Sequence, residues 1–168
     1  MQKTLEQILI SSYKEEMISF MHTHQEVYDE AVELAVGDNQ PFSWRAAWLL
    51  WSCMENNDKH IQKHIKTILK SIPAKKDGHQ RELIKILSRM KLKDEQEGIL
   101  FNICMNIWEG IHKNPSVRVT AFKFIVKLAK KHSELKNEIT FLTQDHYMDT
   151  LSPGVKNSVS KMLNELCL

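Results

Sequence analysis

The stretch PFSWRAAWLLWSCMENNDKHIQKHI, residues 41–65, decides the fold because it returns in altered form later in the chain. A shift of 74 residues aligns the two copies, and the aligned pairs are Pro41 with Pro115, Ala47 with Ala121, Trp48 with Phe122, Ile61 with Leu135 and Ile65 with Ile139. A middle copy, 83–90, lies about halfway between them. Helix pairs that recur every 36 to 38 residues are typical of stacked α-hairpins. The sequence therefore predicts an all-α fold, an α-α superhelix of about four stacked helical hairpins.

The rest of the chain supports helices joined by short loops. It has only 5 Gly and 4 Pro among 168 residues, and its apolar residues recur at helical spacing. Asn114-Pro115 and Ser152-Pro153 each place a capping side chain before a proline, which predicts helix starts there. About nine helices and no strand are expected. We predict one domain, 1–168, with acidic capping helices in 1–40, repeats in 41–151 and a capping helix in 152–168.

Charge is unevenly distributed along the chain, although its net value is only +2. Residues 1–40 carry two basic and eight acidic side chains, and the remainder carries 21 basic and 13 acidic ones. The longest apolar run, 46–51, is too short for a membrane span, and the N-terminus lacks a signal-peptide pattern. The three cysteines are far apart and form no CxxC motif. These features predict a cytoplasmic protein that does not enter membranes.

NPSVRVTAFKFIVKLAKKHSELKNEI, residues 114–139, resembles a HEAT-type repeat: a proline opens it, Val117 and Arg118 precede Ala121, and an apolar stripe, a short turn and a second helix follow. The stretch 41–65 looks like a divergent copy. From about residue 25 onward, the chain is similar to small bacterial HEAT-like proteins of unassigned function. This resemblance implies a HEAT-like α-solenoid, related to armadillo-type repeats, and a habit of binding other molecules. It implies no reaction.

Three of the four tryptophans, Trp44, Trp48 and Trp51, lie in the first copy. On a helix, they share one broad face with Ala47 and Met54, and Leu49 falls outside that face. The corresponding positions in the later copy, Phe122 and Ile125, are ordinary core residues. We therefore expect the tryptophans to form core between repeats. The alternative is a stacking platform for a ligand, assisted by Arg45 and Arg118.

Lysines supply the clearest sign of a binding surface. Lys123, Lys127, Lys130 and Lys131 follow one face of a predicted helix. Together with Arg45 and Arg118 they make a candidate basic ribbon, which would bind a phosphate backbone in a salt-dependent way. The alternative is that these lysines only solvate the outer faces of the helices.

Other groups of reactive residues do not complete a catalytic or metal site. His60 and His64 are spaced to share a helix face, but the sequence indicates no third ligand. Asp145–Asp149 contains several titratable residues at a predicted helix end, and Cys104 lies about two turns from His112. No phosphate-binding glycine motif occurs. We expect no catalytic residue, metal or cofactor.

Two functions remain. The first is a non-catalytic scaffold that holds a protein or peptide on the surface of a short α-solenoid. The alternative is a nucleic-acid-binding protein that distantly resembles the alkylpurine DNA glycosylases built from HEAT-like repeats. Those enzymes use aromatic residues with an Asp and an Arg, whereas here Arg45 is followed by no Asp before Asp58. The partner's identity and the oligomeric state stay open.

Overall fold

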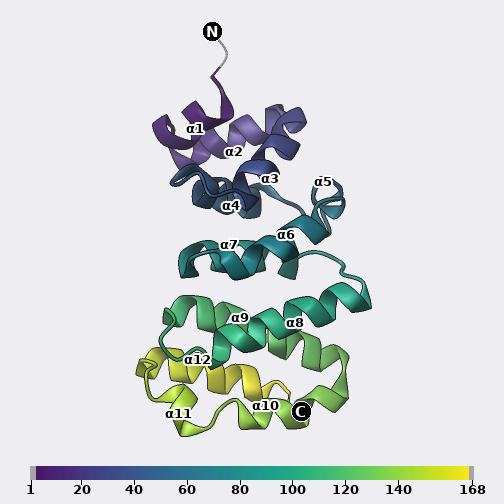
Figure 1. Cartoon of the computed structure of the whole chain (residues 1–168), viewed down its shortest axis with the longest axis vertical. Coiled ribbons are helices and arrows are strands. Elements are labelled where there is room, and N and C mark those ends of the chain that lie inside the picture. Colours follow the sequence, from purple (N-terminus) through teal and green to yellow (C-terminus); the bar gives the residue numbers. More distant parts are fainter. Residues whose placement is uncertain (1–2, 167–168) are drawn as a thin grey trace. The chain divides into compact units, whose positions relative to one another are not determined.

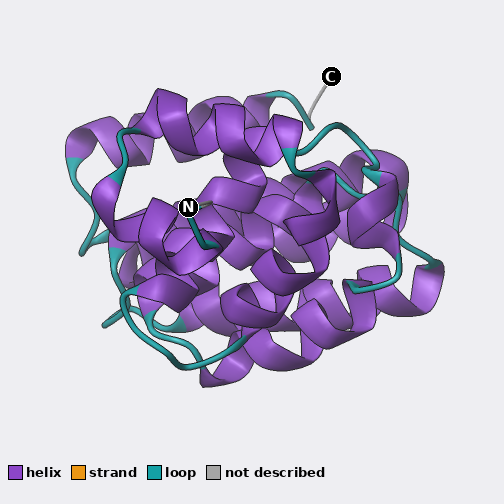
Figure 2. Ribbon diagram, turned by 90° about the horizontal axis from the view of Figure 1, so that it is seen from above, coloured by secondary structure: helices purple, strands orange, loops and turns teal. Residues whose placement is uncertain are grey.

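The structure is a computed structural model that describes residues 3–166. This part of the chain contains twelve α-helices and three short 3-10 helices and no strand (Figure 2). The chain divides into two compact units, Met1–Leu92 and Lys93–Leu168. The all-α prediction is confirmed. The helix count differs from the expected nine, because two predicted helices are broken, near Tyr13 and Lys63, and because 145–148 adds a short helix.

The first unit contains seven α-helices (Figure 1). They are α1 (Leu5–Ser11), α2 (Lys14–Thr23), α3 (Tyr28–Val36), α4 (Phe42–Cys53), α5 (Lys59–Gln62), α6 (Ile65–Ser71) and α7 (Asp77–Ser88). The 3-10 helices Gln25–Val27 and Ile72–Ala74 precede α3 and follow α6. Helix α4 is central, because it packs against α1, α2, α3 and α7. Its buried Leu49 and Leu50, with Leu83 and Ile86 of α7, belong to the core of this unit.

The second unit contains five α-helices. They are α8 (Asp94–Glu109), α9 (Pro115–Lys131), α10 (Lys136–Phe141), α11 (Asp145–Met148) and α12 (Pro153–Asn164), with the 3-10 helix Ser133–Leu135 before α10. Helix α9 packs against α8, α10 and α12. The predicted starts of α9 and α12 are confirmed, since the side chains of Asn114 and Ser152 accept hydrogen bonds from the backbone N–H groups of Ser116 and Val155.

The repeat is visible in the second helix of successive hairpins. Helices α4, α7, α9 and α12 begin 35, 38 and 38 residues apart. Equivalent positions on these helices hold Ala47, Leu83, Ala121 and Val159, each 0% exposed. The spacing read from the sequence therefore marks a recurring core position, as expected when each hairpin buries one face against its neighbours.

Candidate binding surface on α4 and α7

The three tryptophans of α4 are not core residues, which corrects the prediction made from the sequence. Trp44, Trp48 and Trp51 are each only partly buried. The buried side of α4 consists of smaller residues, namely Ser43, Ala46, Ala47, Leu49, Leu50 and Cys53. Small side chains let neighbouring helices approach α4 closely, and the large indole rings remain at the edge of the packed surface. Leu49, which was expected outside the buried stripe, is 0% exposed.

Trp108 of α8 shows how a core tryptophan of this chain differs. It is 0% exposed, and its indole Nε1–H donates to the backbone oxygen of Leu142 at 2.8 Å. Its ring lies 4.6 Å from that of Phe122. Within the described residues, Trp44, Trp48 and Trp51 make no such hydrogen bond through their indole N–H groups. These three rings therefore retain a donor and part of a ring face for another molecule.

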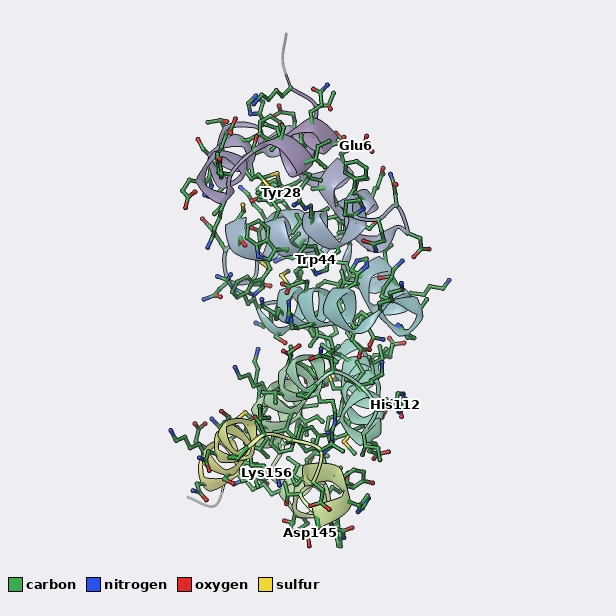
Figure 3. All side chains as sticks on the ribbon, turned by 90° about the vertical axis from the view of Figure 1, so that its left-hand side faces the viewer. Glu6, Tyr28, Trp44, His112, Asp145 and Lys156 are labelled. Carbon is green, nitrogen blue, oxygen red and sulfur yellow. The ribbon has the colours of Figure 1, made fainter. Side chains whose placement is uncertain are left out.

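Trp44, Trp48 and Trp51 lie one above another along the helix, within roughly 60° of its circumference at about 100° per residue. Figure 3 shows Trp44 on the ribbon of the first unit. We call the three exposed indole surfaces together the indole face. Helix α7 borders it, because a Cβ added at Gly78 would lie 3.7 Å from Nε1 of Trp44. This distance is an ordinary van der Waals contact, so the Nε1 edge of the Trp44 ring faces α7.

Cationic side chains of α7 and its C-terminal cap border the other end of the indole face. The Nζ of Lys85 lies 3.6 Å from the centre of a Trp51 ring, and the guanidinium carbon of Arg89 lies 6.0 Å from it. Arg89 also donates to the backbone oxygen of Trp51 at 3.1 Å and to Oδ1 of Asn56 at 3.2 Å. These contacts hold both cations beside Trp51 by charge–ring attraction and hydrogen bonding.

A buried carboxylate on α7, that of Glu82, holds Lys85 in place. Glu82 is 1% exposed, and its two oxygens accept hydrogen bonds at 3.0 Å from Nε of Arg81 and Nζ of Lys85. A carboxylate at such a depth requires cationic or hydrogen-bonded partners, because burial strongly disfavours an unpaired charge. Lys85 is thus held between Glu82 and the Trp51 ring, with 26% of its side chain exposed.

The residues of the predicted basic ribbon differ in their surroundings. Lys123, Lys127, Lys130 and Lys131 are exposed on α9. Lys130 forms an ion pair with Glu165, and Lys131 with Glu97 at 2.8 Å, a contact that raises the pKa of Lys131. All four lysines lie on α9.

The two arginines assigned to the ribbon serve as internal donors. Arg118 is 0% exposed, and it donates to the backbone oxygens of Trp108 at 2.9 Å and Tyr147 at 2.6 Å and to Oγ1 of Thr150 at 3.1 Å. Burial lowers its pKa. In the first unit, Arg45 donates to the backbone oxygen of Leu9 in α1. Arg118 is therefore separated from solvent, unlike the lysines of the ribbon.

A polar depression of about 170 Å³ lies between α3 and the segment after α4. Within it, Asp58 accepts from Nδ1 of His60 at 2.9 Å, and the His60 ring stacks on Tyr28. Burial raises the pKa of the nearby Cys53 thiol to about 11, which keeps it protonated. His64 instead contacts Asp29, at 2.8 Å. His60 and His64 thus have different partners. Among the described residues, no group of three or more His, Cys, Asp or Glu side chains could hold a metal ion.

The other groups singled out from the sequence belong to the second unit. Cys104 is fully buried, which raises the pKa of its thiol, and His112 is exposed. Asp145, labelled in Figure 3, begins the short helix α11, where the rings of His146 and Tyr147 lie 3.8 Å apart. The backbone oxygen of Tyr147 is a partner of Arg118. This segment thus contributes to the internal hydrogen bonding of the second unit.

Comparison with protein-family models finds a match to a HEAT repeat domain over residues 1–166. The chain belongs to the HEAT repeat family. The resemblance noticed in 114–139 is confirmed, and the match also includes the acidic region 1–40. Membership of this family implies an α-solenoid of helical hairpins. Searches of curated proteins and of solved structures found no match. None of the helices described in this HEAT repeat protein has the length and apolar character needed to cross a membrane.

Proposed function

We propose that this HEAT repeat protein is a non-catalytic scaffold that holds an extended segment of a protein partner on the indole face. The observation that carries the proposal is the contrast between Trp108, whose N–H is used inside the protein, and the three partly exposed tryptophans of α4. Tryptophan is enriched among the residues that dominate protein interfaces, because it combines a large apolar ring with a hydrogen-bond donor. Helical repeats commonly provide such surfaces.

The three rings span a length of α4 that about three residues of an extended chain would cover. Along α4, Trp48 lies about 6 Å from Trp44 and about 4.5 Å from Trp51, at a rise of about 1.5 Å per residue. In an extended peptide, carbonyl groups on the same side recur about every 6.8 Å. Both spacings are shorter than this repeat, so the proposal rests on side chains of the peptide that cover the ring faces and not on a match between indole N–H groups and backbone acceptors.

Selection from a random peptide library displayed on phage tests this function. The full chain is the bait, and the counter-bait is the triple variant Trp44→Ser, Trp48→Ser, Trp51→Ser, checked by circular dichroism for an unchanged helix content. We expect enriched peptides that bind the natural chain and lose most of their binding to the triple variant. Peptides that bind both proteins equally, or a failure to enrich any peptide, would overturn the proposal.

Nucleic acid is a second candidate ligand, supported by the exposed row Lys123, Lys127, Lys130 and Lys131. Such a row can follow a phosphate backbone, and binding then weakens steeply as salt rises. The test is fluorescence anisotropy of labelled single-stranded and duplex DNA at low and near-physiological salt. Binding that depends on salt and is lost in Lys123→Glu, Lys127→Glu would favour this function. No binding at low salt would exclude it.

A further inference from the structure

From the charges around the indole face, we infer that the bound segment is acidic and that Asp or Glu side chains of the partner contact Lys85 and Arg89. This inference rests on the proposed function and specifies its ligand. Helix α4 carries no acidic side chain. Helix α7 with its cap carries three cations, Arg81, Lys85 and Arg89, against two carboxylates, Asp77 and Glu82.

Lys85 is held in position before any ligand arrives. Its ammonium group rests on the Trp51 ring and donates one hydrogen bond to Glu82. An ammonium has three N–H donors, and the side chain is 26% exposed, so it can donate to a partner's carboxylate without leaving Glu82. Because the side chain is already ordered, little conformational entropy is lost on binding.

Arg89 provides the second contact. Its Nε and Nη1 groups donate to Asn56 and Trp51, and both acceptors are neutral. A guanidinium has five N–H donors, so donors remain, and its positive charge is not cancelled by these partners. A carboxylate that approaches Trp51 from the solvent side would thus meet two cations that differ in donor geometry. A basic segment would be repelled by the same pair.

Glu82 acts as a positioning residue for Lys85. It is nearly inaccessible at 1% exposure, so it orients Lys85 without offering a contact to the partner. Removing Lys85 alone would deprive this buried carboxylate of one partner and destabilise the fold. The informative variant therefore changes both residues, Glu82→Gln with Lys85→Gln, which preserves the net charge and replaces the ion pair by amides.

The experiment measures fluorescence anisotropy of labelled peptides, acetylated and amidated at their ends, added to the full chain. The first peptide repeats the unit Leu-Glu-Ser, and its matched controls repeat Leu-Gln-Ser and Leu-Lys-Ser. We expect the Glu peptide to bind about tenfold more tightly than the Gln peptide, and the Lys peptide to bind most weakly. The Gln peptide with a free C-terminal carboxylate tests whether a terminal carboxylate is recognised instead.

Variants connect this preference to the cations. We expect the Glu82→Gln, Lys85→Gln variant and, separately, Arg89→Gln to lose the preference for Glu over Gln, whereas Lys85→Arg retains it. The control Lys66→Gln removes an exposed lysine of α6 and should change nothing. Equal affinity for the three peptides, or a preference that persists in both variants, would refute the acidic ligand while leaving peptide binding intact. If no peptide binds and selection also fails, the proposed function itself is wrong. Binding of oligo-dT that exceeds that of the Glu peptide and depends on Lys85 would assign the face to nucleic acid instead.

Discussion

At the scale of single residues, the largest side chains of α4 are not its most deeply buried ones. Its three largest side chains are partly exposed, while Ala46, Ala47 and Leu49 are fully buried. The helical wheel correctly placed the tryptophans together, but the apolar run 46–51 has no polar position to reveal which side packs. Packing on several sides then selected the small residues. The tryptophan environment therefore could not be predicted from periodicity alone, because an indole ring suits both a core and a binding surface.

This difference predicts an inversion of the usual effect of side-chain size on stability. Trp48→Ala should lower the free energy of unfolding by no more than Leu49→Ala does, about 2–4 kcal/mol, although the indole side chain is much larger, because part of that side chain is exposed whereas Leu49 is fully buried. Urea unfolding followed by circular dichroism measures both changes. A larger loss for Trp48→Ala than for Leu49→Ala would show that the tryptophan belongs to the core.

The hydrogen bonds of Asp58 predict how the free energy of unfolding depends on pH. Burial raises the pKa of this carboxyl group, but hydrogen bonds from Glu55 and His60 lower it more, so the net pKa lies below its ordinary value. Because the folded-state pKa is lowered, the stabilisation is present above the unfolded-state pKa of about 4 and is lost as pH falls through the folded-state pKa.

We expect Asp58→Asn to cost about 1 kcal/mol at neutral pH and to reduce the loss of stability between neutral and acidic pH. Urea unfolding at a series of pH values provides the test, with Asp38→Asn for comparison: the pKa of Asp38 is also lowered, by Lys75, but this residue is exposed, so its substitution should change the pH dependence less. If the free energy of unfolding of Asp58→Asn fell with pH in the same way as that of the natural chain, Asp58 would make no contribution to this pH dependence.

At the scale of elements, the second unit depends on Arg118 to join helix ends. Its guanidinium group donates to Trp108 near the end of α8, and to Tyr147 and Thr150 in and after α11. The sequence marked this residue as part of a HEAT-type motif, but charge alone could not distinguish a surface arginine from a buried one. Only the packing around α9 shows that three acceptors depend on it.

Arg118→Lys should therefore be destabilising although it preserves the charge. Lysine cannot reproduce the planar array of donors, so at least one buried backbone oxygen would lose its partner, at a cost of about 2–3 kcal/mol. The exposed control Lys123→Arg should change the unfolding free energy by less than about 0.5 kcal/mol. Differential scanning calorimetry compares the two, and equal melting temperatures for both variants would contradict the structural role.

The element boundaries show what was predictable from local sequence. Asn114-Pro115 and Ser152-Pro153 start α9 and α12 as expected, because a cap and a proline act locally. The break between α1 and α2 was missed. There, Ser12 adopts an extended conformation at the end of α1, and apolar residues continue on both sides of it. Because the apolar spacing continues across this break, the spacing could not reveal that α1 ends there.

At the scale of the whole molecule, the repeat period was read correctly because each hairpin uses the same buried position. The prediction of one domain, 1–168, stays a prediction, and the two compact units Met1–Leu92 and Lys93–Leu168 make it testable. In repeat proteins, stability is approximately a sum of terms for each repeat and for its neighbours. A local substitution should then act mainly near its own site.

Phe122→Ala provides this test, because Phe122 is 0% exposed and contacts Trp108. We expect faster amide hydrogen exchange in α8, α9 and α12, with a smaller increase in α3 and α4. Phe122→Ala should lower the free energy of unfolding by about 3–5 kcal/mol. Exchange that rises equally in both units would indicate a single cooperative domain. Leu50→Ala, in the core of the first unit, should give the reverse pattern.

The indole face is tested most directly by fluorine NMR of the full chain labelled with 5-fluorotryptophan. Four resonances are expected, one for each tryptophan, and each is assigned by a single Trp→Phe variant. On transfer from H₂O to D₂O, the resonances of Trp44, Trp48 and Trp51 should shift and that of Trp108 should not. Addition of the Leu-Glu-Ser peptide should move the same three and leave Trp108 in place. Four equally insensitive resonances, or a peptide response confined to Trp108, would contradict a binding surface on α4.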